Sequence, residues 1–226
     1  MAKIIKLCTI FRSYMTKVFI GGSRKISRLS QAVTNRIDNI LVNNFTVLVG
    51  DADGVDVLVQ KYLFAKNYSQ VIVFCTGNFC RNNIGHWETR NVPTVVRSKG
   101  FQFYTIKDLA MAKEATHGFM IWDGKSKGTL NNILNLLQMD KKTLVFFAPT
   151  QAFYSVRIVD EILSLLDQCD HHDVEIFEKE LALSNIIGKL QQGAIGNTNS
   201  QMRLNLESLA ESENNTNLSE VTAILA

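Results

Sequence analysis

A short stretch of small, hydroxylated and basic residues interrupts the apolar pattern of this chain between Asp123 and Thr129. It reads DGKSKGT, follows the apolar run GFMIW and precedes residues with helical periodicity. The N–H groups at the start of a helix have no partner within the helix, and they attract anions such as phosphate. We therefore expect Asp123, Ser126, Lys127, Gly128 and Thr129 to form a phosphate site. The same residues also suit a capped turn with its lysines in solvent, and the sequence leaves both interpretations open.

A second glycine-containing loop follows the first predicted strand and also leads into a helix. It reads IGGSRKIS, in which Gly21 and Gly22 permit close approach of a ligand to the backbone. Ser23 and Arg24 can bind an oxyanion. Taken alone, this loop is a weak indication of a binding site.

A third loop follows the second predicted strand and is acidic. It reads GDADGVD and lacks both the spacing and the final glutamate of a calcium loop. Asp51 can cap the next helix, and Asp56, in its first turn, can reach a ribose hydroxyl. Because the carboxyl ends of parallel strands meet at one edge of a sheet, we expect the three loops to lie together. Their hydroxyls, cations, glycines and carboxylates fit a nucleotide better than a simple anion.

A long segment from Gly77 to Ser98 follows the third predicted strand and is expected to be a loop at the same edge. Trp87 can stack on a base, Asn82 can read the edge of that base, and Arg81 can contact phosphate. Glu88 is the first candidate for a catalytic acid, base or nucleophile. Alternatively, Trp87 anchors the loop on the core and the charged side chains are solvated.

Residues 17 to 170 alternate short β-branched runs with segments of helical period, which indicates an α/β fold. We expect a Rossmann-like doubly wound, mostly parallel sheet with helices on both faces, because the runs are continuously apolar. The expected strands are Lys17–Gly21, Thr46–Gly50, Gln70–Thr76, Gly118–Asp123 and Thr143–Pro149, with Phe101–Thr105 as an edge strand; the expected helices cover residues 27–43, 54–66, 107–116, 129–139 and 155–168.

The chain outside this domain has a different character. Residues 1–16 are expected to be an N-terminal extension, and residues 171–226 a helical extension with a polar tail. The latter would contain one helix over residues 174–192, a flexible joint over residues 193–200 and a second, short helix over residues 202–211.

The three loops together resemble the SLOG superfamily of Rossmann-like nucleotide-binding proteins, most closely its YspA or cpYpsA-related branch. The similarity covers about residues 17–150. It implies that the GGSR and KGT segments bind the phosphate side of a ligand, and that the G-x-x-G-x-D element corresponds to Gly50, Gly54 and Asp56. The related LOG enzymes, which cleave nucleotide N-glycosidic bonds, resemble PGGxGTxxE at the G-T loop. Asn132 stands where that glutamate would be.

Composition limits the partners of this chain. A formal net charge of +3, from 24 basic and 21 acidic residues, does not indicate a nucleic-acid or membrane surface. No apolar run reaches the length of roughly 20 residues that a membrane span needs. We expect a cytoplasmic protein that forms a homo-oligomer, as the dimers common among SLOG proteins imply.

The four cysteines form no C-x-x-C pair and are expected to be reduced thiols. Cys75 and Cys80 as a metal-binding pair is the alternative. No metal site is expected, and the only cofactor or ligand expected is a nucleotide.

Three functions remain open. The first is a nucleotide-binding protein, such as a ligand sensor. The second is an enzyme that cleaves or transfers a nucleotide N-glycosidic bond, with Glu88 or Asp56 as its carboxylate. The third is a single-strand nucleic-acid binder, as the DprA-like SLOG relatives are, and the balanced charge counts against it.

Overall fold

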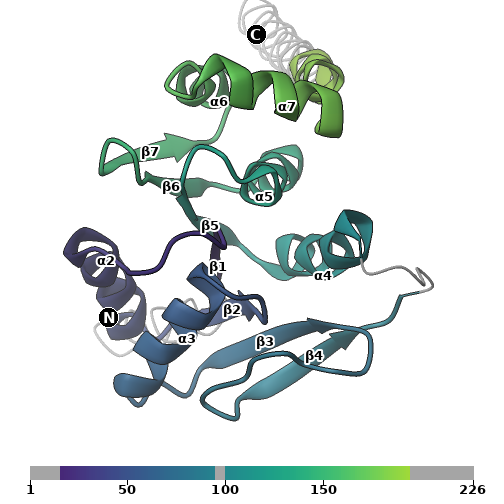
Figure 1. Ribbon diagram of the computed structural model, residues 1–226. Coiled ribbons are helices and arrows are strands. Elements are labelled where there is room, and N and C mark those ends of the chain that lie inside the picture. The colour runs from purple at the N-terminus through teal and green to yellow at the C-terminus, as the bar shows by residue number, and fades with distance from the viewer. Residues whose placement is uncertain (1–15, 95–99, 194–226) are drawn as a thin grey trace, which may run out of the picture. The chain divides into compact units, whose positions relative to one another are not determined.

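The computed structural model describes residues 16–94 and 100–193, and its core is a seven-stranded sheet (Figure 1). The strand order is β4-β3-β2-β1-β5-β6-β7, and every neighbouring pair is parallel except β6 and β7. This topology confirms the expected doubly wound α/β fold. The strands are β1 (Lys17–Gly22), β2 (Thr46–Gly50), β3 (Val71–Thr76), β4 (Glu88–Val92), β5 (His117–Trp122), β6 (Thr143–Phe147) and β7 (Ala152–Val156).

Helices cover both faces of the sheet. In Figure 1, α2 and α3 lie on one side of the sheet and α4 and α5 on the other. This arrangement explains the continuously apolar strands, since both of their faces are buried. The helices are α2 (Gln31–Val42), α3 (Val55–Ala65), α4 (Phe101–Glu114), α5 (Lys127–Gln138), α6 (Val159–Leu166) and α7 (His171–Leu181).

Helix α2 illustrates how local sequence sets these elements. Ser30 caps α2, because its side chain accepts a hydrogen bond from the N–H of Val33. Val33, Ile37 and Ile40, spaced four and three residues apart, form the buried stripe of the helix. They join the hydrophobic core formed with β1, β2 and β3.

The strand order reverses between β1 and β5. From β1 the chain proceeds outward through β2, β3 and β4, whereas β5, β6 and β7 extend the sheet in the other direction. The two helices that follow β1 and β5 therefore leave on opposite faces, which opens a crevice at the carboxyl ends of these strands. Open α/β sheets bind their ligands at such a point.

Two predicted elements are wrong in type, and a third, a helix, begins later than predicted. Phe101–Thr105 begins α4, which continues to Glu114, and is not an edge strand. The predicted helix over residues 155–168 instead contains the end of β7, a turn and then α6.

The third error concerns the segment from Gly77 to Ser98, which contains β4 and is therefore not a continuous loop. Its strand ETRNV is polar and lies at the edge of the sheet, where only one neighbour must be matched. A polar edge strand carries little of the apolar signal on which strand prediction depends.

The chain divides into a compact unit that ends at Leu183 and a second one that starts at Ser184. Helix α7 belongs to the first unit and packs on its core, since the rings of Phe177 and Trp122 lie 5.9 Å apart. In the second unit, residues 184–193 are helical. The predictions for residues 1–15 and 194–226 lie outside the described residues. Within residues 16–94 and 100–193, no helix is long and apolar enough to cross a membrane.

Candidate functional site

The loops after β1 and β5 are joined by a buried hydrogen-bond network. The hydroxyl of Ser23 donates to Oδ1 of Asp123 at 2.8 Å and accepts from the Asp123 N–H at 3.1 Å. Its oxygen also lies 3.3 Å from the hydroxyl oxygen of Thr129. Ser23 is fully buried and Thr129 nearly so. These predicted ligand residues therefore hold two loops together across the point where the strand order reverses.

The turn between β5 and α5 is organised by Asp123. Its Oδ1 also accepts the N–H groups of Lys125 and Ser126, at 3.0 and 2.8 Å. Ser126 is the N-cap of α5, and its hydroxyl accepts from the N–H of Thr129 at 3.4 Å and from the Thr129 hydroxyl at 3.1 Å. The capped turn anticipated as the alternative interpretation is thus present, and α5 begins at Lys127.

The cap of α5 leaves some backbone N–H groups at the start of the helix without a hydrogen-bond acceptor in the described part of the chain. Among the residues that the structure describes, the N–H groups of Lys127 and Gly128 have no acceptor. A side chain at Gly128 would have room, since a Cβ there would meet nothing nearer than the Ser126 hydroxyl at 4.0 Å. The first turn of α5 therefore presents two free donors and an open approach to the backbone.

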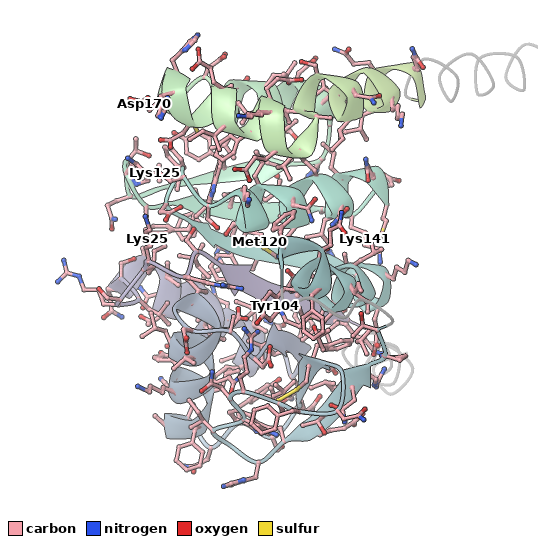
Figure 2. The ribbon with its side chains drawn as sticks, turned by 45° about the vertical axis from the view of Figure 1, so that its right-hand side comes forward. Lys25, Tyr104, Met120, Lys125, Lys141 and Asp170 are labelled. Carbon is pink, nitrogen blue, oxygen red and sulfur yellow. A yellow bond between two sulfur atoms is a disulfide. The ribbon has the colours of Figure 1, made fainter. Side chains whose placement is uncertain are left out.

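This helix end opens into a cavity of about 530 Å³ at the carboxyl ends of β1, β2 and β5. Small-molecule sites in proteins typically measure roughly 300–1,000 Å³. In Figure 2, Lys25 and Lys125, from the loops after β1 and β5, lie toward one side of the molecule, and Tyr104 lies farther in. Of the predicted ligand residues, the cavity is lined by Gly21, Gly22, Arg24, Asp56, Asp123, Ser126, Lys127, Gly128 and Thr129.

Several cations lie around the mouth of the cavity, and some of them form no ion pair with any described residue. Lys127 pairs with Glu180 of α7, and Lys125 lies 3.8 Å from Asp173. Arg24 and Lys25 are exposed and form no ion pair with any residue in the described ranges. These two side chains are the cations most available to a bound anion.

Asp56 contributes a buried carboxyl group to the wall of the cavity. One of its oxygens accepts the N–H of Ala52 at 3.1 Å, closing the turn before α3. Burial raises the pKa of Asp56 to about 6, and the nearby Lys107 ammonium opposes that rise. Gly50 permits this arrangement, because a side chain there would overlap both the Asp56 carboxyl group and Nζ of Lys107. Such a carboxyl group changes its charge near neutral pH.

Lys107 of α4 is a buried cation that the sequence did not single out. It is 3% exposed, and Nζ lies 2.5 Å from a carboxylate oxygen of Asp108. Burial alone would lower its pKa, but Asp108, Asp56 and Asp51 together raise it. Lys107 therefore stays charged beside the carboxyl group of Asp56.

Asp51 and Arg81 form an ion pair behind this wall. The Arg81 guanidinium donates to both carboxylate oxygens of Asp51, at 2.5 and 3.1 Å, and the Arg81 N–H adds a third bond at 3.1 Å. Burial would raise the pKa of Asp51, but the hydrogen bonds from Arg81 hold it below its ordinary value. The Asn82 side chain donates to the backbone carbonyl of Asp51 at 2.8 Å. Arg81, Asn82 and Asp51 thus stabilise the loops and do not line the cavity.

Arg81 nevertheless contacts the cavity wall through Tyr104. Its guanidinium carbon lies 4.5 Å from the centre of the Tyr104 ring, and that of Arg24 lies 5.2 Å from the same centre. Such contacts between cations and rings fix the position of the aromatic group. Tyr104 and Phe101 line the cavity, so α4 supplies an aromatic surface.

The structure places Trp87 and Glu88 away from the cavity. Glu88 pairs with Ile72 near the start of β3, close to the amino end of the sheet, and its side chain is 63% exposed. The Trp87 ring donates to the backbone carbonyl of Tyr68 at 2.8 Å and packs against the core. Trp87 therefore anchors its loop on the core and does not face the cavity.

Some glycines near the site allow backbone segments to pack closely against one another. A side chain at Gly22 would overlap the Ile121 carbonyl, so Gly22 permits the close approach of β1 and β5. Gly54 has a φ of 77°, which favours glycine, and lies against the backbone of Arg24. Neither Gly50 nor Gly54 lines the cavity.

The expectation of reduced thiols is wrong for one pair of cysteines. Cys75 at the end of β3 and Cys80 in the next loop form a disulfide, with their Cα atoms 5.0 Å apart. The loop folds back across the end of β3, which brings the two sulfur atoms together despite the lack of a C-x-x-C motif. A carboxylate oxygen of Asp51 and both sulfur atoms lie within 4.8 Å of one another. With the sulfurs bonded and Asp51 paired with Arg81, these atoms do not form a metal site.

The residues that the sequence analysis missed are those on α4. Phe101, Tyr104, Lys107, Asp108 and Met111 line the cavity, and apart from the adjacent Lys107 and Asp108 they follow one another at intervals of three residues. Had FQFYTIKDLAMAKE been interpreted as one helix, this spacing would have placed them on a single face.

Comparison of the chain with protein-family models and with curated proteins gives no match.

Proposed function

We propose that the cavity at the carboxyl ends of β1, β2 and β5 binds a nucleotide or a nucleotide-derived ligand. Its phosphate would lie at the first turn of α5, near Arg24 and Lys25. Membership of the SLOG superfamily, a sensor role and a dimeric state belong to the same proposal. The resemblance of the GGSR, GDADGVD and DGKSKGT loops supports the first of these.

One observation carries the proposal. The free N–H groups of Lys127 and Gly128 open into a cavity at the point where the strand order reverses. Helix N-termini bind phosphate through unpaired N–H groups and the helix dipole, and doubly wound sheets bind nucleotides at this place. Arg24 and Lys25 add positive charge that no other described residue neutralises.

The other side of the cavity suits a sugar and a base. Tyr104 and Phe101 offer aromatic rings for stacking, and Asp56 offers a carboxyl group that can accept a hydrogen bond from a hydroxyl. Asn132 also lines the cavity, and its buried Oδ1 has no hydrogen-bond partner. A hydrogen-bond donor on the ligand would satisfy it.

A steric test follows from Gly128. Calorimetric titration of the full chain with a panel of nucleoside mono-, di- and triphosphates should identify a ligand with micromolar or tighter affinity. Gly128→Ala adds a methyl group where the structure has space, so the fold should be retained. Affinity should fall by at least about tenfold, because the methyl group lies where phosphate would approach.

Arg24 and Arg28 provide a matched pair of charge variants in one loop. Both are exposed, but only Arg24 lines the cavity. Arg24→Ala should weaken nucleotide binding by about tenfold, since a charged hydrogen bond is lost, whereas Arg28→Ala should leave it unchanged. If no nucleotide binds the wild-type chain, or if both variants behave alike, the proposal is wrong.

A second candidate function is cleavage of a nucleotide N-glycosidic bond, favoured by the position and pKa of Asp56. A carboxyl group with a pKa near 6 can exchange protons at neutral pH. The test is to incubate the protein with nucleoside monophosphates and to measure the free base by chromatography. Base must accumulate with time, and Asp56→Asn must abolish it while nucleotide binding persists. Intact nucleotide throughout would leave binding as the function.

A further inference from the structure

A second cavity, of about 700 Å³, lies at the opposite end of the sheet from the nucleotide cavity proposed above. Val18, His117, Gly118 and Thr143 line it where β1, β5 and β6 begin. These positions are adjacent across the sheet, since Val18 pairs with His117 and Gly118 with Thr143. The last turns of α2 form the opposite wall.

The floor of this cavity is apolar. Val18, Ile40 and Phe119 are buried and line it, and Phe45 and Leu144 add partly buried apolar surface. The cavity is large enough for a small organic molecule, and its floor favours a hydrocarbon chain.

The rim of this cavity has only one sign of charge. Arg36, Lys142 and Arg157 line it, and no aspartate or glutamate of the described residues does. All three are exposed, and none forms an ion pair with any residue in the ranges 16–94 and 100–193. The Arg36 guanidinium lies 5.4 Å from the centre of the Phe153 ring, which restrains it beside the cavity.

His117 adds no positive charge at neutral pH. Burial and the nearby Lys142 lower the pKa of His117, and its Nδ1 lies 3.0 Å from the Thr116 hydroxyl. The positive charge of the rim therefore comes from Arg36, Lys142 and Arg157. A ring of unpaired cations around an apolar floor is complementary to a molecule with an anionic head and an apolar chain.

We propose that this cavity binds a single-chain amphipathic anion, a fatty acyl carboxylate, with its head at Arg36, Lys142 and Arg157 and its chain on the apolar floor. The site is independent of the nucleotide proposal, because the two cavities share no lining residue.

Decanoate, below its micelle concentration, is the probe, and calorimetric titration of the full chain is the measurement. Octanoate, which is two methylenes shorter, should bind about fifteenfold more weakly than decanoate, since each buried methylene contributes about a fourfold change in affinity. Butyrate represents the head alone and nonanol the chain alone, and each should bind at least about tenfold more weakly than decanoate. Equal binding of butyrate would identify a simple anion site, and equal binding of nonanol a purely apolar one; either result would overturn the proposal.

Variants locate the bound probe. The triple change Arg36→Gln, Lys142→Gln and Arg157→Gln should weaken decanoate binding by about tenfold or more, because three partly exposed charge contacts are lost. Lys61→Gln, at an exposed lysine of α3 that lines neither cavity, is the control and should have no effect.

Two further variants test whether decanoate binds in this cavity and not in the other one. Ser155→Trp places a large ring at an exposed position that lines this cavity, so it should block decanoate while circular dichroism shows an intact fold. Arg24→Ala should leave decanoate binding unchanged. If the probe does not bind the wild-type chain, or if Arg24→Ala weakens it while Ser155→Trp does not, the proposed site is wrong.

Discussion

Two groups of charged side chains, one at each end of the sheet, differ in how they are paired. At the carboxyl end, Asp51 is buried against Arg81, and Lys107 is buried against Asp108. At the amino end, the exposed cations that line the second cavity, Arg36, Lys142 and Arg157, have no ion pair within the described part of the chain. A buried charge is strongly tied to its partner, whereas an exposed one contributes little to folding. Removing a partner from either buried pair should therefore affect stability, whereas changes to Arg36, Lys142 and Arg157 should affect only binding.

The largest expected effect on stability follows from the loss of Arg81. Arg81→Ala should lower the free energy of unfolding by about 3 kcal/mol, because it leaves the Asp51 carboxylate buried without its partner. Urea denaturation of the variant and the wild type measures the difference. Arg81→Ala with Asp51→Asn should recover part of the loss; a single variant as stable as the wild type would contradict the assignment of Asp51 and Arg81 as a stabilising pair.

A second effect depends on pH and on Asp56. Its pKa is about 6 in the folded protein, against an ordinary value of 3.8. The folded state therefore holds this proton more tightly, which gives stability that is fully present below about pH 4 and is lost as the pH rises through 6. Relative to Asp56→Asn, the wild type should lose about 3 kcal/mol between about pH 4 and about pH 8. Denaturant titrations at both pH values measure this difference, and parallel curves for the two proteins would exclude it.

A third prediction compares two glycines of the carboxyl end. Gly22→Ala should lower the free energy of unfolding by about 2 kcal/mol, because its Cβ would overlap the backbone of β5. Gly128→Ala should leave it unchanged or raise it by up to about 0.5 kcal/mol, since alanine is favoured over glycine in a helix. Thermal unfolding of the pair provides the measurement; destabilisation by Gly128→Ala would mean that the first turn of α5 is less open than described.

The smallest expected effect is at the amino end. Arg157→Gln should change the free energy of unfolding by less than about 0.5 kcal/mol, because its side chain is exposed and forms no described ion pair. The same denaturation assay applies. A loss comparable with that of Arg81→Ala would remove the contrast between the two ends.

The sequence predicted the fold well because most of its strands contain uninterrupted runs of apolar residues. Runs such as TVLVG and GFMIW are apolar on both faces, and only a covered parallel sheet accommodates several of them. The polar strand β4 and the aromatic start of α4 were missed because their local composition resembles that of another element. In both cases, the neighbours in the folded chain decide the structure.

The sequence analysis anticipated residues of the cavity that lie in or beside loops but not those that lie on the face of α4. Gly128 and Arg24 could be anticipated because glycines and cations after a strand have a defined place at the edge of a sheet. Ser23 was expected to bind a ligand, yet its hydroxyl is used within the protein by Asp123. Tyr104 and Lys107 required the packing of α4 on the sheet, which no local pattern specifies.

The network around Ser23 has a kinetic consequence. Because Ser23, Asp123 and Thr129 already hold the loops after β1 and β5 together, a ligand that enters the carboxyl-end cavity meets a preorganised surface. Little ordering entropy is then lost on binding. Association should occur in one step at an ordinary protein–ligand rate that is linear in ligand concentration, and differences in affinity among ligands should arise mainly from their dissociation rates.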